Sequence, residues 1–210
     1  VAGTFGRGLW ECDLCLPLLD HELVISDTTE WSSKAKMLQD VRIEAGGRLT
    51  VSSLIEMGID RTIRVMPGGE LIIVRGTLTN DCVGMWDGIR VYGSSDYNDP
   101  ASRQGRITLL HGGSVQYADT AIKFIAVDQQ GNPLSSAGGG IVVAENARFI
   151  NNKVHLEINP SSGSNPSSFS LCQFNISKKL PDGSGYGPMV VLKSNKGVSF
   201  TSCQFENNIP

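Results

Sequence analysis

Residues 41–51 read VRIEAGGRLTV, and residues 63–73 repeat the pattern as IRVMPGGELII, 22 positions further along the chain. A third copy, ITLLHGGSVQY, occupies residues 107–117, another 44 positions on. Each copy reads apolar, any residue, apolar, two further residues, Gly-Gly, any residue, apolar, any residue, apolar. A self-similar unit at a fixed offset is typical of proteins that stack one structural unit on the next.

The pattern within each copy predicts two short strands joined by a sharp corner. Alternation with a period of two places Ile, Val and Leu on one face of a strand. Gly-Gly supplies a corner where the backbone can adopt a positive φ or approach a neighbour closely. A helix is excluded, because two central glycines cost about 2 kcal/mol relative to Ala and the apolar period is wrong. An offset of 22 residues suits three short strands and three turns. We therefore predict an all-β fold, a right-handed single-stranded parallel β-helix (solenoid).

The offset of the third copy has two interpretations. It corresponds either to two full circuits or to the same strand-corner-strand unit placed at a different corner. A polar insert begins at Ser94 and ends at Gly105, between the copies. The sequence therefore leaves both interpretations open, and with them the register of all circuits beyond Val91.

Later circuits follow the pattern more loosely. Residues 171–175 read LCQFN and residues 202–208 read SCQFENN. Equivalent residues of successive circuits lie about 4.8 Å apart in a stacked coil, so we expect Cys172 and Cys203 to lie one above the other. We interpret them as small buried side chains of one core column. A disulfide between them is the alternative.

Composition argues against two classes of partner. The formal net charge is -3, from 18 basic and 21 acidic residues without obvious blocks. This distribution lacks the basic surface that nucleic acid requires. The longest apolar run is far shorter than the roughly 20 residues that span a bilayer. We expect no nucleic acid as partner and no membrane insertion.

The chain divides into two parts on the basis of the repeat. We expect residues 1–37 to form an N-terminal cap that leads into the solenoid, with Leu23-Val24-Ile25 as a first strand and Trp31 packing at the start of the stack. Residues 38–210 are expected to form the parallel β-helix. A strand-and-turn pattern continues to the last residues without a polar cap, so we expect the β-helix to be truncated at its C-terminal end. Further domains of the same parent chain are the expected neighbours.

The cysteines and histidines do not predict a metal site. Cys12 and Cys15 form one C-x-x-C, whereas structural zinc usually takes four ligands in two clustered pairs. The three histidines are scattered, at His21, His111 and His155. A redox C-x-x-C would sit in a βαβ context, which is absent. We expect no metal and no cofactor, and interpret Cys12 and Cys15 as a local disulfide or as two plain thiols.

Residues 86–93, WDGIRVYG, follow GTLTN at residues 76–80. Together with the Gly-Gly repeats, these motifs resemble β-helix segments of large secreted bacterial proteins in the pectin-lyase-like group, over roughly residues 31–208. The resemblance implies a secreted or cell-surface location and a role as one module of a longer chain. It implies no single activity, because the group includes lyases, hydrolases and adhesins.

A lyase of that group would need acidic side chains that converge on calcium from neighbouring turns. The candidates are Asp81 and Asp87, which flank a strand start, and Asp96 and Asp99 in the first insert. Aspartate also commonly accepts hydrogen bonds from turn amides, and this is the competing interpretation.

A glycoside hydrolase would need two carboxylates that face one cleft. Glu145 and Glu157 are arbitrary choices for such a pair. His111 precedes Gly112 at the corner of the third repeat, where the second repeat has Pro67, which indicates a turn position. The catalytic residues of an enzyme with this sequence are therefore unknown.

Four polar inserts interrupt the repeat, and inserts in solenoids leave from corners and often gather into one surface. They occupy residues 94–105, 127–140, 159–166 and 178–188. Exposed aromatic rings stack on sugars. The candidate ligand-binding residues are therefore Tyr92, Asp96, Tyr97, Asp99 and Tyr186.

The leading hypothesis is a non-catalytic extracellular β-helix module, structural or ligand-binding, within a larger secreted bacterial protein. A polysaccharide or a cell-surface glycan is the expected ligand. One alternative is a polysaccharide lyase or glycoside hydrolase of the pectin-lyase-like group. The other is a carbohydrate-binding module.

Overall fold

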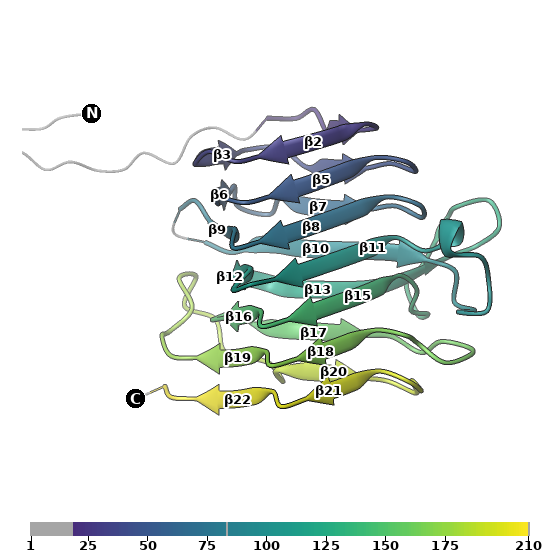
Figure 1. The fold of residues 1–210 in the computed structure, drawn as a ribbon. Coiled ribbons are helices and arrows are strands. Elements are labelled where there is room, and N and C mark those ends of the chain that lie inside the picture. The colour runs from purple at the N-terminus through teal and green to yellow at the C-terminus, as the bar shows by residue number, and fades with distance from the viewer. Residues whose placement is uncertain (1–18, 83, 210) are drawn as a thin grey trace, which may run out of the picture.

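A computed structural model describes residues 19–82 and 84–209, which wind into a stack of coils around one axis (Figure 1). The strands of these residues form three sheets in which successive coils pair in parallel. Each coil adds one strand to every sheet. The chain is a right-handed parallel β-helix, and the predicted fold class is confirmed.

The three sheets are numbered here in the order in which the chain visits them. Sheet 1 contains β1 (Leu23–Ile25), β4 (Val41–Ile43), β7 (Thr62–Val65), β10 (Trp86–Gly93), β13 (Ala118–Val127), β17 (Val154–Ile158) and β20 (Val190–Leu192), and β14 (Pro133–Leu134) pairs with β13 in antiparallel fashion. Sheet 2 contains β2 (Thr28–Trp31), β5 (Arg48–Val51), β8 (Glu70–Val74), β11 (Arg106–Leu110), β15 (Ile141–Glu145), β18 (Ser168–Ser170) and β21 (Ser199–Thr201). Sheet 3 contains β3 (Ala35–Met37), β6 (Leu54–Met57), β9 (Thr77–Asn80), β12 (Ser114–Gln116), β16 (Arg148–Ile150), β19 (Gln173–Ile176) and β22 (Gln204–Asn207). A 3-10 turn, η1 (Ala101–Arg103), lies between β10 and β11.

The register explains the three copies of the repeat. The first two copies stack directly, with Val41 paired to Ile63. The third copy is the same unit at the next corner, because Ile107 of β11 pairs with Leu71 of β8 in sheet 2. The first two copies thus turn from sheet 1 to sheet 2, and the third turns from sheet 2 to sheet 3. Of the two interpretations left open by the sequence, the different corner is the correct one.

Inward-facing side chains form columns that run the length of the stack. The columns are aliphatic in the first coils, where Leu49, Leu71 and Ile107 follow one another fully buried. Full burial of such a side chain stabilises the fold by about 1.5–3 kcal/mol. Near the C-terminal end the columns become aromatic. Phe149 and Phe174 stack with ring centroids 4.8 Å apart.

The Gly-Gly corners are required by close backbone approach. A Cβ atom on Gly69 would lie 2.7 Å from the carbonyl oxygen of Ile43 in the coil before it. A Cβ atom on Gly113, at the corner of the third copy, would lie 2.5 Å from the carbonyl oxygen of Ile73. Only glycine allows successive coils to approach this closely at the corner.

Cys172 and Cys203 occupy the corner between sheets 2 and 3. The amide of Gln204 donates to the Cys172 carbonyl, and the amide of Gln173 donates to the carbonyl of Ala147, so these small residues follow one another in one column. Both cysteines are free thiols. The predicted column of small side chains is confirmed, and the alternative disulfide between the two is not formed. Burial raises the pKa of the Cys172 thiol to about 11.

Residues 1–37 were predicted to form an N-terminal cap; residues 1–18 of it, with Cys12 and Cys15, lie outside the described residues, whereas residues 23–37 form a coil in register with the next one. Leu23 pairs with Val41 in sheet 1, and Ala35 pairs with Ile55 in sheet 3. Trp31 ends β2 and packs against the first core residues, as its position suggested. Among the residues that the structure describes, no helix has the length and apolar character needed to cross a membrane.

Candidate functional site

The longer connections of the last four coils gather at one corner of the β-helix. Residues 94–105, 128–140, 159–167 and 193–198 all link a strand of sheet 1 to a strand of sheet 2. Together they are called the corner surface below. Residues 177–189 instead link β19 of sheet 3 to β20 of sheet 1, so the last predicted insert lies at a different corner. Figure 1 shows the two groups of loops at opposite sides of the stack.

Gln104 connects two loops of the corner surface from the inside. Its side chain is buried, with 4% exposure. Its amide nitrogen donates to the carbonyl of Ser94, and its amide oxygen accepts a hydrogen bond from the Gly140 amide at 2.8 Å. A buried amide with both ends bonded holds its partners firmly, because breaking either bond leaves a desolvated polar atom.

Asparagine and serine side chains continue this bonding along the corner. Asn195 donates through Nδ2 to the carbonyl oxygen of Asn159, and its Oδ1 atom accepts from the hydroxyl of Ser161 at 2.8 Å. The amide of Ser162 donates to the carbonyl of Ser95 at 2.9 Å, although the two residues lie in different coils. The loops therefore form one continuous polar surface.

Tyr97 anchors the first loop. Its hydroxyl donates to the Gly140 carbonyl at 3.1 Å, and burial raises its pKa. Asp96 accepts hydrogen bonds from the Asn98 amide and side chain, both at 2.9 Å. Asp99 accepts from the Ser94 hydroxyl. These three predicted ligand-binding residues lie together, but the bonds shown here support the loop itself.

The two other predicted tyrosines lie elsewhere. Tyr92 is 5% exposed and packs on the outer side of sheet 1 with Ile125, Val127 and Met66, so its ring is directed away from solvent. Tyr186 lies in the loop 177–189, where its hydroxyl donates to the Lys178 carbonyl at 2.6 Å. The structure therefore does not bring Tyr186 together with the other predicted site residues.

The aspartates considered for calcium binding are also separated. Asp81 follows β9 and pairs with Lys36 of β3. Asp87 lies on β10 and pairs with Arg90 at 2.7 Å. Partial burial raises the pKa of Asp87, and Arg90 opposes the shift. Residues 19–82 and 84–209 contain no group of three or more His, Cys, Asp or Glu side chains arranged to hold a metal ion.

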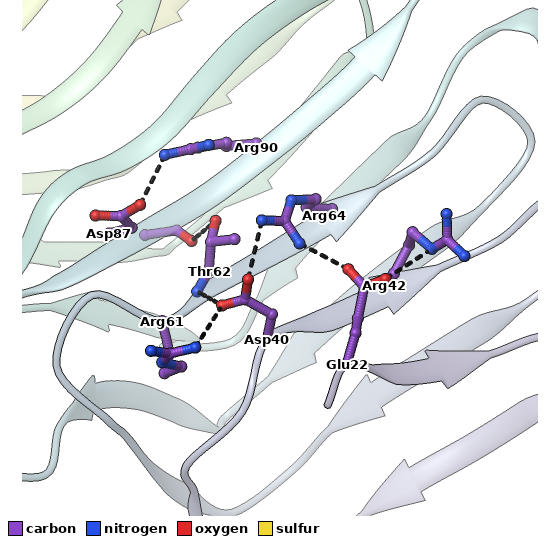
Figure 2. A network of polar contacts seen from close by, with 9 residues as sticks. Glu22, Asp40, Arg42, Arg61, Thr62, Arg64, Asp87 and Arg90 are labelled. Atoms are coloured by element: carbon purple, nitrogen blue, oxygen red, sulfur yellow. Dashed lines mark hydrogen bonds and ion pairs between the residues drawn. The ribbon is translucent and has the colours of Figure 1, made fainter. Parts of the chain in front are cut away.

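Sequence reasoning missed a ladder of arginines on the outer face of sheet 1, shown in Figure 2. Arg42, Arg64 and Arg90 are register partners in successive coils. Arg64 donates to Glu22 at 2.6 Å and to Asp40 at 2.9 Å. Glu22 bridges Arg42 and Arg64, and Asp87 pairs with Arg90, so these carboxylates offset the repulsion between the stacked like charges.

A signal for this ladder was present in the sequence. Arg42 and Arg64 occupy the same outward position of the first two repeat copies, and Arg90 occupies it in GIRV. Because each guanidinium of the ladder has a carboxylate partner, we interpret the ladder as a stabilising element of the scaffold.

No family model matches the chain, and neither the search of curated proteins nor the search of solved structures found a match. The corner surface is therefore interpreted from its own chemistry. Eighteen of the forty residues in its four loops are Ser, Asn or Gln, and the loops carry three acidic and three basic residues. Five of the eighteen are buried and support the loops from inside, namely Ser94, Gln104, Asn159, Asn165 and Ser167. Such a surface offers hydrogen-bond donors and acceptors with little net charge.

Proposed function

We propose that this chain is a non-catalytic β-helix module of a secreted or cell-surface protein, similar to modules of the pectin-lyase-like group, and that its corner surface binds a neutral polysaccharide or glycan. One observation carries the proposal. The connections of four successive coils, which differ in length, converge on a single corner, where they form a hydrogen-bonded surface that is rich in amides and hydroxyls and has no formal net charge.

The chemistry of the corner surface suits hydroxyl-rich ligands. Sugar hydroxyls both donate and accept hydrogen bonds, as do the side chains of Ser, Asn and Gln. Charge selects for or against ionised ligands, and here Asp96, Asp99 and Asp128 are balanced by Arg103, Lys193 and Lys196. The surface also extends along the axis of the stack, which suits a polymer better than a small molecule.

Two further features support this assignment. Cys82 is disulfide-bonded, and disulfides persist mainly in oxidising, extracytoplasmic compartments. Two of the aspartates considered for calcium binding form ion pairs, Asp81 with Lys36 and Asp87 with Arg90. Within residues 19–82 and 84–209, no specific contact favours the alternative of a lyase or hydrolase.

The test is a binding and turnover assay of the purified chain on a panel of neutral and acidic polysaccharides. We expect binding to at least one neutral glycan, with no release of reducing ends or unsaturated products. Turnover that co-purifies with the protein and is lost on Asp87→Asn would replace the proposal with the lyase or hydrolase alternative.

A pair of matched variants locates the binding site. Gln129 and Gln130 are exposed on the corner surface, whereas Lys178 and Lys179 are exposed in the loop 177–189. Replacing both glutamines with Ala should weaken glycan binding about fivefold or more, the equivalent of roughly 1 kcal/mol for lost hydrogen bonds. Replacing both lysines with Ala should leave affinity unchanged. The opposite result would move the site away from the corner surface.

A further inference from the structure

A groove lies where the short corners of the early coils meet the first loop of the corner surface. It has a volume of about 340 Å³ and is called the glycine groove below. It is lined from the early corners by Gly46 and Gly68, from the 3-10 turn η1 by Ala101 and Ser102, and from sheet 2 by Glu70 and Arg106. Sites for small molecules occupy about 300–1,000 Å³, so a groove of this size suits a single sugar residue.

Glu70 and Arg106 present an acceptor and a donor side by side in the glycine groove. They are register partners on β8 and β11, about 4.8 Å apart along the axis of the stack. Within the part of the chain that the structure describes, the guanidinium of Arg106 forms no hydrogen bond or ion pair. Glu70 accepts from Arg48 through Oε2 at 2.7 Å, which leaves Oε1 as a further acceptor. Both side chains can therefore bond to a ligand in the groove.

The charges of the glycine groove favour an uncharged ligand. Glu70 and Arg106 are the acidic and the basic side chain among the lining residues, so their formal charges cancel. A carboxylate ligand would be attracted by Arg106 but repelled by Glu70, and a cation would meet the reverse. A hydroxyl group both donates and accepts hydrogen bonds. Two adjacent hydroxyls of a sugar ring can accept from Arg106 and donate to Glu70, and bonds to ionised groups are the stronger ones.

The backbone of the groove is held in place by hydrogen bonds across three coils. The amide of Gly46 donates to the Gly68 carbonyl at 2.9 Å, and the amide of Gly68 donates to the Gln104 carbonyl at 3.1 Å. The side chain of Gln104 is bonded in turn to Ser94 and Gly140. The groove is thus preformed and joined to the loops of the corner surface. A preformed site loses less conformational entropy when its ligand binds.

We propose that the glycine groove binds one neutral sugar residue of the glycan, with two adjacent ring hydroxyls bonded to Arg106 and Glu70. The inference rests on the proposed function and adds to it a defined subsite and a chemical requirement. The loop 94–105 contributes to both the groove and the corner surface, so the following sugar residues of the chain extend over the corner surface. A sugar residue whose adjacent hydroxyls are blocked does not meet the requirement.

Calorimetric titration with short neutral oligosaccharides derived from cellulose, mannan and starch tests the subsite. Arg106→Met keeps the length of the side chain but removes its donors, and should weaken binding about tenfold or more. Arg148→Met is the matched control. Arg148 is exposed on β16 in sheet 3, and it too has no hydrogen-bond or ion-pair partner among residues 19–82 and 84–209. Its replacement should leave affinity unchanged, and denaturant titration checks that both variants are folded.

Filling the groove provides a second, steric test. Ala45 is exposed and lines the groove, so Ala45→Leu places a larger side chain there without a polar group. We expect a loss of affinity similar to that of Arg106→Met. Gly185→Leu is the control, because Gly185 is exposed in the loop 177–189 and a Cβ atom there meets no atom within 4 Å. It should bind the oligosaccharides as the unaltered protein does.

Failure of the subsite and failure of the proposed function give different results. Unchanged affinity of Arg106→Met and Ala45→Leu for a neutral glycan that binds the unaltered protein would overturn the subsite and leave the proposed function standing. Binding of no neutral glycan at all would overturn both. Binding of acidic oligosaccharides alone, lost in Arg106→Met, would also overturn the inference, because the groove would then select a carboxylate.

Discussion

The first three coils and the last four coils share one scaffold but differ at the corner between sheets 1 and 2. In the early coils this corner is short: β4 connects to β5, and β7 to β8, through turns that end in Gly-Gly. In the later coils it carries the loops of the corner surface. The stacking hydrogen bonds and the inward-facing positions of the strands are the same in both regions. Coil geometry therefore depends on strands and columns, while the corner connection is free to lengthen and acquire function.

The two regions also differ in the core. Aliphatic columns fill the early coils, whereas Phe149, Phe174 and Phe205 stack in the late coils with ring centroids 4.8 and 4.6 Å apart. Parallel stacking follows directly from the register, because like residues at one position must lie over one another at the strand spacing. Larger side chains thus fill the interior of the coils that carry the long loops.

The largest expected effect comes from removing the centre of the aromatic column. Phe174 is fully buried between two stacked rings. Phe174→Ala should lower the free energy of unfolding by about 3–5 kcal/mol, measured by denaturant titration. Phe205→Ala is the control, because Phe205 is 49% exposed and should cost much less. Equal losses would show that the late coils do not depend on the column.

The second prediction concerns the pH dependence of the late coils. His155 is fully buried, its Nδ1 atom lies 3.1 Å from the Asn152 amide nitrogen, and its Nε2 atom has no partner. Burial lowers the pKa of His155 to about 4 from its ordinary value of 6.5. The unfolded chain therefore takes up the proton first. The contribution of the buried, neutral His155 to the free energy of unfolding is complete above pH 6.5. It is lost as the pH falls toward 4, by about 3 kcal/mol in total.

Unfolding titrations at several pH values test this prediction. His155→Leu should remove most of the loss between pH 6.5 and 4, whereas the exposed His111→Ala should leave it in place. A pH profile that is the same in both variants would assign the acid sensitivity to other groups.

The third prediction concerns the short corner of the early coils. Gly69→Ala places a methyl group 2.7 Å from the Ile43 carbonyl oxygen and should cost about 1–3 kcal/mol in thermal or denaturant unfolding. Gly185→Ala is the matched control, because a Cβ atom there meets no atom within 4 Å. If Gly69→Ala left the free energy of unfolding unchanged, the corner would be able to accommodate a side chain without loss of stability.

The smallest expected loss of unfolding free energy comes from a substitution in the arginine ladder. Arg64 is 29% exposed and bridges Glu22 and Asp40. Arg64→Met, which keeps the length of the side chain, should cost no more than about 1 kcal/mol. The cost should shrink at high salt, because partly exposed pairs are screened. A large loss of unfolding free energy that is independent of salt would contradict this interpretation of the ladder.

The regular coils could be predicted from the sequence, because the alternating apolar residues of the repeat mark the inward-facing positions and its Gly-Gly pairs mark the corners. The third copy could not be placed, because the insert 94–105 hides which corner the unit occupies. The convergence of several inserts on one corner follows from register, which a single sequence with variable coil lengths does not define. Tyr97 and Asp96 were correctly placed in a loop. Their bonds to Gly140 and Asn98 depend on loop geometry that no local pattern specifies.

Hydrogen exchange of backbone amides, with and without a bound neutral glycan, tests the central claim most directly. The account predicts slower exchange in residues 94–105, 128–140, 159–167 and 193–198, and no change in residues 177–189. Protection confined to the loop 177–189 or to the arginine ladder would contradict it.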